Sequence, residues 1–329
     1  MAMPLPDERA LPTGWLALGA EQLARTLSAR DAVAQARAVS GFLPRGVASL
    51  PTPLLESMQS QIDKARRFVE LHNQCFIIPN PWDRGSARLL ESLGFEALAT
   101  TGAGYAWSRG SADLSVGRAS MMAYLRDLCA ATDLPVSADL QNGFGDAPEV
   151  VCECIAESAR TGIVGASIED AGSDAAQPIY DIGLATERIR AASQAAKALG
   201  FPFTLTARAE NYLHGRPDLK DTIRRLQAYQ DAGADVLFAP GLSSADDIRA
   251  VSSSVDRPLN VMMGMPGSPL NMLQLETLGV RRVSVGGSLA RAAYDALMRA
   301  GHELRAEGTF RYAQTDLTSK RLNAILGRD

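Results

Sequence analysis

From residue 75 onward, short apolar runs alternate with longer amphipathic stretches of helical spacing. A strand-sized run followed each time by a helix-sized stretch is typical of parallel strands joined by right-handed crossovers. Eight such units close into a (β/α)8 TIM-type barrel, for which about 250 residues suffice. The expected strands are 75–79, 97–101, 135–139, 164–169, 203–207, 236–240, 258–262 and 282–285.

The stretches between these runs predict the helices of an α/β fold. Apolar residues recur there at three- and four-residue steps, and a glycine follows several stretches at the position of a helix C-cap. An open doubly wound sheet is the alternative, but no G-x-G-x-x-G motif follows the first run. The expected helices are 86–93, 117–131, 148–161, 184–199, 219–232, 244–251 and 269–278, and 288–326 is long enough for the eighth barrel helix and an extra one.

Residues 1–70 precede this repeat and differ from it. Helical spacing over 16–39 and 54–71 is interrupted by glycine- and proline-rich sequence, and the segment contains no catalytic motif. We therefore expect two parts. A helical N-terminal extension covers 1–70 and packs on the barrel or on a neighbouring subunit, and a (β/α)8 catalytic domain with C-terminal helices covers 71–329.

The charge balance excludes several classes of partner. The 33 Lys and Arg residues against 37 Asp and Glu give a net charge of −4, which provides no basic field for a nucleic acid. No apolar run is long enough to span a membrane, and the N-terminus resembles neither a secretory nor a mitochondrial leader. Four cysteines are too few for a disulfide framework. These features are typical of a cytoplasmic enzyme that acts on a small molecule.

Polar residues end several of the apolar runs, where a barrel carries its reacting groups. Asp139 and Gln141 follow the third run, Glu169 the fourth and Arg208 the fifth, while Thr101 begins a glycine-rich turn after the second. Carboxylate oxygens suit Mg²⁺, an arginine holds a carboxylate through two parallel hydrogen bonds, and exposed backbone N–H groups hold an anionic oxygen. This set predicts stabilisation of an enolate formed by breaking a bond next to a carbonyl. Salt bridges in the barrel rim are the alternative role for these acids.

Six segments in a fixed order carry recognisable motifs: Asn80–Arg88, Ala97–Gly104, Ala138–Gly145, Ser167–Asp170, Thr206–Arg208 and Tyr229–Asp235. Together they resemble the isocitrate lyase/phosphoenolpyruvate mutase superfamily. The resemblance covers about residues 75–305, so it implies a barrel and does not explain the first 70 residues. The combination is specific to the superfamily but not to one activity within it.

The resemblance implies roles for the strand-end residues. Asp139 corresponds to the carboxylate that binds Mg²⁺, with Mn²⁺ as the alternative ion, and Gln141 stands where the family has a second Asp. Glu169 corresponds to the acid that holds metal-bound water, which completes the predicted metal site, and Arg208 to the arginine that binds substrate. Further implied site residues are Thr101, Gly102 and Ala103 around the substrate carboxylate and enolate oxygen, Asp113 as an additional catalytic acid, and Asp83 as a substrate-binding residue after the first strand.

One family feature is missing from the chain. Lyases of the superfamily carry a K-[KR]-C-G loop whose Cys protonates the leaving fragment, whereas the segment Asp170–Tyr180 contains no Cys, Lys or Arg. The resemblance thus implies a C–C lyase acting on a small 2-oxo or 2-hydroxy carboxylate, and decarboxylation of a diacid such as oxaloacetate needs no Cys. The alternatives are isocitrate or methylisocitrate cleavage, phosphonopyruvate-type C–P chemistry, and a barrel that binds a metabolite without catalysis. The resemblance also implies a homo-oligomer, either a dimer or a tetramer.

Overall fold

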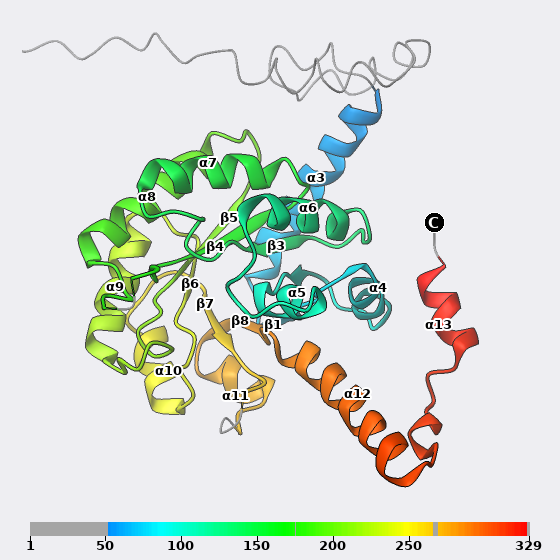
Figure 1. Cartoon of the computed structure of the whole chain (residues 1–329). Coiled ribbons are helices and arrows are strands. Elements are labelled where there is room, and N and C mark those ends of the chain that lie inside the picture. Colours follow the sequence, from blue (N-terminus) through cyan, green and yellow to red (C-terminus); the bar gives the residue numbers. More distant parts are fainter. Residues whose placement is uncertain (1–51, 175, 266–268, 328–329) are drawn as a thin grey trace, which may run out of the picture. The chain divides into compact units, whose positions relative to one another are not determined.

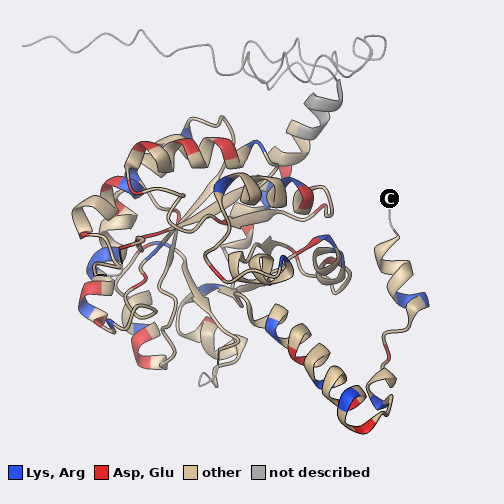
Figure 2. Ribbon diagram, in the orientation of Figure 1, with Lys and Arg blue, Asp and Glu red and all other residues tan. Residues whose placement is uncertain are grey.

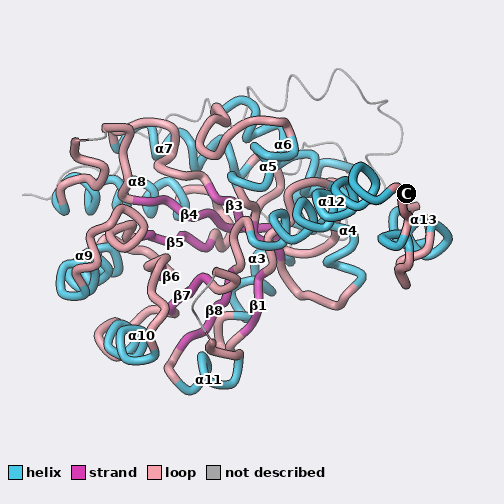
Figure 3. The backbone as a smooth tube through the Cα atoms, turned by 60° about the horizontal axis from the view of Figure 1, so that its bottom comes forward, coloured by secondary structure: helices cyan, strands magenta, loops and turns pink. Residues whose placement is uncertain are grey.

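The computed structural model describes residues 52–174, 176–265 and 269–327, and the chain from Gln61 onward forms one compact unit. Eight parallel strands make a single sheet with the order β1-β8-β7-β6-β5-β4-β3-β2, and helices surround it (Figures 1 and 3). The predicted (β/α)8 barrel of the α/β class is therefore confirmed. The strands are β1 (Phe76–Ile78), β2 (Leu98–Ala99), β3 (Val136–Asp139), β4 (Gly165–Glu169), β5 (Thr204–Arg208), β6 (Val236–Phe238), β7 (Leu259–Met262) and β8 (Val280–Ser284).

The barrel closes between β1 and β2, which stand at the two ends of the strand order. The backbone N–H of Ala99 donates to the carbonyl of Pro79 at 3.0 Å, and Asn80 Nδ2 donates to the carbonyl of Thr100 at 3.0 Å. Asn80 Oδ1 also accepts from two consecutive backbone N–H groups just after β8, each at 2.9 Å. One asparagine therefore joins the ends of β1, β2 and β8.

Each helix predicted from residue 86 onward overlaps an observed one. Several helices begin at a polar residue that caps them, as Asp218 does by accepting from the N–H of Asp221, and Ser244 from that of Asp247. None of the described helices is both long and apolar enough to cross a membrane. The helices are α3 (Thr52–Leu71), α4 (Arg84–Ser92), α5 (Gly102–Ser108), α6 (Arg118–Cys129), α7 (Pro148–Ala159), α8 (Ile182–Lys197), α9 (Leu219–Asp231), α10 (Ala245–Ser252), α11 (Met272–Thr277), α12 (Ser288–Glu307) and α13 (Ser319–Leu326), with the 3₁₀ turn η2 (Arg311–Ala313).

A small apolar cluster closes the N-terminal end of the barrel. Phe68, from the last turns of α3, packs with Phe76 at the start of β1 and with Val164 just before β4. Gln61 Nε2 donates to two backbone carbonyls, at Ala159 and Ile163, both at 2.8 Å. Because this end is covered, the opposite end, where the strands finish, is the one that can hold a ligand.

The helix predicted over 54–71 is confirmed by α3, while the one predicted over 16–39 lies outside the described residues. The division at residue 70 stays a prediction. One local expectation was wrong: the glycine-rich turn after β2 is the start of α5, capped by the Thr101 side chain. A Cβ at Gly104 would lie 2.7 Å from Thr101 Cγ2 and 3.0 Å from Trp82 Cβ, so close packing requires glycine there.

Candidate active site

Arg208, the last residue of β5, is surrounded by three carboxylates. Its NH1 lies 3.1 Å from Asp139 Oδ1, its NH2 3.3 Å from Glu169 Oε2, and its Nε 2.8 Å from Glu210 Oε1. The guanidinium also lies over the ring of Phe238, with its central carbon 5.1 Å from the ring centroid. Three strand ends, β3, β4 and β5, therefore converge on one cation.

The cluster carries more negative than positive charge. Three carboxylates surround one guanidinium, which gives a formal charge of −2 when all are ionised. Burial, together with the neighbouring Glu210 and Asp139, raises the pKa of Glu169 well above its usual value although Arg208 opposes the change. Burial also raises the pKa of Glu210. The three acids in turn raise the pKa of Arg208, although burial opposes its charge. The site thus favours an additional cation.

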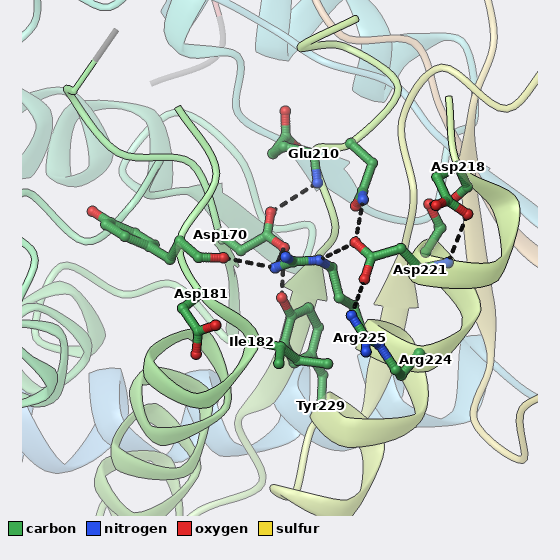
Figure 4. A network of polar contacts seen from close by, with 12 residues as sticks. Asp170, Asp181, Ile182, Glu210, Asp218, Asp221, Arg224, Arg225 and Tyr229 are labelled. Atoms are coloured by element: carbon green, nitrogen blue, oxygen red, sulfur yellow. Dashed lines mark hydrogen bonds and ion pairs between the residues drawn. The ribbon is translucent and has the colours of Figure 1, made fainter. Parts of the chain in front are cut away.

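A second set of polar residues, drawn in Figure 4, holds Glu210 in place. Asp170 Oδ1 accepts from the backbone N–H of Glu210 at 2.8 Å. Asp170 Oδ2 accepts from the Tyr229 hydroxyl at 2.5 Å and from Arg225 NH1 at 3.1 Å. Arg225 Nε is fixed by Asp221 Oδ2 at 2.7 Å. Helix α9 thereby fixes the backbone from which Glu210 reaches Arg208.

Most of the predicted site residues meet at one cavity of about 270 Å³ at the open end of the barrel. Gly102 is placed beside it, because a Cβ there would lie 3.9 Å from Asp139 Oδ2 and 3.4 Å from Gln141 Nε2. Glu169 joins through Arg208. The predicted residues that line the cavity are Thr101, Ala103, Asp113, Asp139 and Arg208.

Asp83 is the predicted residue that the structure does not bring to this cavity. Its Oδ1 accepts from the backbone N–H of Ser86 at 2.7 Å, and Ser86 Oγ accepts from the N–H of Asp83 at 3.0 Å. This reciprocal pair is a capping box at the start of α4. The carboxylate therefore stabilises a helix terminus, and the predicted contact with substrate has no support in this position.

Asp113 reaches the cavity from the loop between α5 and α6. Burial and the negative charge of Asp139 raise the pKa of its carboxyl group, although the N–H of Leu114, 2.8 Å from Oδ1, opposes the change. Asp113 therefore lines the same cavity as Asp139 and Arg208, and its catalytic role stays a prediction.

The residues present fit a hydrated divalent cation. Asp139 Oδ1 accepts from Arg208 and from the backbone N–H of Gln141, at 3.1 and 3.2 Å, while Oδ2 lies on the side of Gly102. Within the described ranges, no group of three or more His, Cys, Asp or Glu side chains is arranged to hold a metal ion, so protein carboxylates alone do not complete a coordination shell here. Mg²⁺ keeps several waters and uses one or two carboxylates, so this donor set suits it.

Gln141 replaces an acid of the family pattern and is held in an unusual backbone conformation. Its φ of 52° is left-handed, and its carbonyl accepts from the N–H of Glu169 at 3.0 Å. Its buried Nε2 has no hydrogen-bond partner among the described residues. A buried polar atom without a partner is uncommon, so this amide is available to a ligand or to an ordered water.

Two buried polar side chains near the cavity were missed by sequence reasoning. Glu210 lies two residues beyond β5, and only its bond to Arg208 shows that it turns back into the barrel. Arg282 lies inside β8 and lines the same cavity. The sequence signal that could have found Arg282 is the alternation of side chains along a strand, because residues 282 and 284 lie on the same face of β8.

The charged residues of α8, α9 and α10 do not gather by sign. Figure 2 shows Asp and Glu interspersed with Lys and Arg along α8 to α10. The concentration of acids around one arginine is thus a property of the barrel mouth.

The fold and the site define a class, a (β/α)8 enzyme with an acidic cluster at the ends of β3, β4 and β5. The chain belongs to the phosphoenolpyruvate phosphomutase family, whose model matches residues 68–305. It is therefore a member of the isocitrate lyase/phosphoenolpyruvate mutase superfamily, which confirms the resemblance and the predicted enzyme class of C–C lyases and mutases.

Curated relatives support this placement. The chain is 32% identical over 243 residues to an uncharacterized protein of Mycobacterium tuberculosis, covering 73% of this chain and 88% of the relative. It is 29% identical over 279 residues to 2-methylisocitrate lyase of Halalkalibacterium halodurans, covering 82% and 91%. It is 30% identical over 253 residues to oxaloacetate decarboxylase of Paraburkholderia xenovorans, covering 74% and 82%.

Solved structures resemble it over similar spans. A crystal structure from Burkholderia cenocepacia J2315, described as a candidate lyase/mutase, is 56% identical with a TM-score of 0.80, covering 81% of this chain and 96% of that one. The structure of oxaloacetate acetylhydrolase in complex with the product oxalate is 27% identical with a TM-score of 0.73, covering 81% and 94%.

Proposed function

We propose that this enzyme is a Mg²⁺-dependent lyase that breaks a C–C bond next to the carbonyl of a small 2-oxo or 2-hydroxy carboxylate through an enolate. The observation that carries the proposal is the cluster of Asp139, Glu169 and Glu210 around Arg208 at the cavity. Enzymes of this superfamily are generally metal-dependent, and relatives are named as a methylisocitrate lyase and an oxaloacetate decarboxylase.

Each residue has a defined task in this proposal. Asp139 would hold the metal, and Glu169, Asp113 and Gln141 would orient its waters. A bound Mg²⁺ polarises a carbonyl and stabilises developing enolate charge. Arg208 binds the carboxylate of the substrate, and its three acid partners fix the orientation of its fork. Thr101 and Ala103 line the same cavity, and their backbone N–H groups, together with that of Gly102, would hold the enolate oxygen.

The segment after β4 limits which reaction these residues can complete. Residues 170–180 contain no Cys, Lys or Arg, and their described part folds back through a bridge between Ala171 and Ile179. No acid of the family's usual kind is therefore supplied by this segment. Decarboxylation of a 2-oxo diacid such as oxaloacetate requires the fewest catalytic groups from the protein, because solvent can protonate the enolate. Oxaloacetate is accordingly the simplest substrate to assay, in parallel with larger 2-oxo and 2-hydroxy acids.

Thermal melting with Mg²⁺, oxalate or both tests the proposal without a known substrate. Oxalate imitates the enolate of a 2-oxo acid. Ligand at a hundred times its dissociation constant stabilises a protein by about 2.7 kcal/mol. We expect a shift in melting temperature that needs both components and that disappears in Asp139→Ala.

The matched control is Asp133→Ala. The Asp133 carboxylate is fully exposed, and its ion pair with Lys64 is long, at 3.9 Å, so little should be lost with it. This variant should shift as the wild type does. If the wild type shows no shift with both components present, the enolate mechanism is wrong and a barrel that binds another metabolite becomes the better explanation.

The predicted homo-oligomer remains part of the proposal. Helix α12 buries only Ala290 within this chain, and it exposes Leu297 and Met298 by 65% and 59%. An apolar helix face of this kind suits packing against a second copy. Sedimentation of Leu297→Lys/Met298→Lys should show a smaller species than the wild type, and an unchanged species would contradict the proposal.

The proposed location is the cytoplasm, and the four unpaired cysteines support it.

A further inference from the structure

Arg282 on β8 is a second buried guanidinium inside the barrel, with only 5% of the residue exposed. It lines the same cavity as Asp139 and Arg208. Its Nε donates to Asn260 Oδ1 and its NH2 to Thr206 Oγ1, both at 2.9 Å. Both of these partners are neutral, so neither compensates the charge.

The third contact of Arg282 is also neutral. Its NH1 lies 3.5 Å from Nε2 of His72. His72 Nδ1 lies 2.8 Å from the carbonyl of Phe68, which can only accept, so Nδ1 carries the proton and Nε2 is a bare acceptor. Burial and the nearby Arg282 lower the pKa of His72 to about 3, so the ring is uncharged at neutral pH.

The charge of Arg282 is therefore unbalanced within the part of the chain that the structure describes. Burial alone lowers its pKa to about 9, and no carboxylate contributes to the shift. A guanidinium has five N–H donors, and the three contacts use three of them. Buried charges are normally paired, so an unpaired cation beside a cavity indicates that the ligand supplies the anion.

Several hydroxyl groups line the cavity that Arg282 shares, among apolar residues such as Ile78 and Phe238. Ser137, Ser167 and Ser284 line the cavity, each less than a tenth exposed. Asn260 Nδ2 donates to Ser284 Oγ at 3.1 Å, which orients the Asn260 carbonyl toward Arg282. Hydroxyl groups of this kind can satisfy the remaining lone pairs of an oxyanion.

We propose that Arg282 binds a second carboxylate of the substrate, apart from the 2-oxo or 2-hydroxy acid end that Asp139 and Arg208 receive. The enzyme then selects diacids over monoacids. This inference rests on the proposed function and narrows it. A paired guanidinium stabilises the bound carboxylate as an anion and so opposes its loss as carbon dioxide. The carboxylate at Arg282 is therefore one that the reaction retains, which favours cleavage of a larger diacid over decarboxylation of oxaloacetate.

Binding of lactate and malate tests the inference, because the two 2-hydroxy acids differ by the distal carboxylate. Calorimetry with Mg²⁺ should show that the wild type binds malate at least tenfold more tightly than lactate. In Arg282→Met the ratio should fall to near one, while oxalate binding stays unchanged. Arg281→Met is the matched control, since Arg281 precedes Arg282 on β8 and lies on the other face of the strand. This control should keep the preference for malate.

The possible failures separate the two proposals. If the wild type does not bind oxalate with Mg²⁺, the proposed function fails. If it binds oxalate but prefers malate over lactate by less than twofold, only the role of Arg282 is overturned. Should Arg282→Met fail to fold, Arg282→Lys keeps the charge without the fork. That variant should weaken malate binding several-fold and leave lactate binding unchanged, and an equal change for both ligands would overturn the inference.

Discussion

Arg208 and Arg282 are both buried in the barrel and line one cavity, but their surroundings differ in charge. Three carboxylates lie within 3.3 Å of the Arg208 nitrogens and raise its pKa against the effect of burial. The partners of Arg282 are an amide, a hydroxyl and a neutral imidazole, and its pKa falls to about 9. One side of the cavity therefore has an excess of negative charge and the other an unpaired positive charge.

This difference indicates what each side requires from a ligand. The side of Arg208 has a formal charge of −2 and is completed by a divalent cation together with the acid end of a substrate. The side of Arg282 is completed by an anion. A single diacid bound with Mg²⁺ satisfies both sides at once, and the variants below separate their contributions.

The largest expected effect is on stability, from removing Arg208. Arg208→Met leaves the buried Glu169 and Glu210 and the half-buried Asp139 without a cation, and breaking a buried ion pair costs about 3–5 kcal/mol. Arg282→Met removes an unpaired buried charge. Because burying that charge is unfavourable, its removal offsets the loss of the neutral hydrogen bonds, and the decrease in the free energy of unfolding should be clearly smaller than for Arg208→Met. Urea denaturation at pH 7 measures both, with Arg281→Met as the control. Equal costs at the two positions would refute the contrast between them.

The next effect concerns the residue that sequence reasoning missed on the acidic side. Glu210→Gln removes one negative charge and weakens the orientation of Arg208. Residues that orient metal-site groups typically contribute about 10–100-fold to affinity or activity. We expect a rise of this size in the Mg²⁺ concentration that half-saturates oxalate binding. Glu187→Gln, on the exposed surface of α8, is the control. An unchanged Mg²⁺ requirement would leave Glu210 with a purely structural role.

A smaller effect on stability is expected at the Tyr229–Asp170 hydrogen bond, which supports the backbone of Glu210. Tyr229→Phe removes the hydroxyl that donates to Asp170 Oδ2 at 2.5 Å. A hydrogen bond to a charged group contributes about 1.5 kcal/mol or more, so stability should fall by about that amount. Tyr105→Phe loses only a 3.5 Å contact with a backbone carbonyl and should change stability little. Similar losses in the two variants would show that the Tyr229 hydroxyl does not support the site.

The effect that is smallest per unit of the variable changed is a pH dependence of stability at Glu169. Its pKa is raised in the folded protein by burial and by neighbouring acids, so the folded state binds the proton more tightly than the unfolded state does. Its contribution to stability is complete below the unfolded pKa of about 4.3 and is lost as the pH rises through the folded pKa.

Glu169→Gln cannot ionise, so without metal its stability relative to the wild type should increase with pH. The slope for one proton is at most about 1.4 kcal/mol per pH unit. Urea titrations at several pH values in EDTA measure this slope, and Mg²⁺ should reduce it. A difference that stays constant or decreases with pH would contradict the raised pKa.

The fold was predictable because the eight repeats of strand and helix admit few arrangements. The ends of the strands were less predictable, because β2 comprises only Leu98–Ala99 within a longer apolar run. Asp139 and Arg208 were predictable as cavity residues because both end strands, whereas their roles stay predictions. Glu210 was not predictable as a cavity residue, because the direction of its side chain depends on Asp170, which follows a different strand, β4. Of the adjacent Arg281 and Arg282, only the register of β8 decides which points inward.

The closure of the barrel beside Asn80 has a consequence for dynamics. Among the described residues, one backbone hydrogen bond, from Ala99 to Pro79, and the side chain of Asn80 join β1 to β2, whereas β4 and β5 pair over five residue positions. Local openings follow the least-bonded segments, so the amide of Ala99 should exchange with deuterium before those of β4. Thr101 follows this junction directly. A ligand that contacts both the Thr101 turn and Arg208 would stabilise the barrel next to the β1–β2 junction, so ligand binding should slow the deuterium exchange of the Ala99 amide.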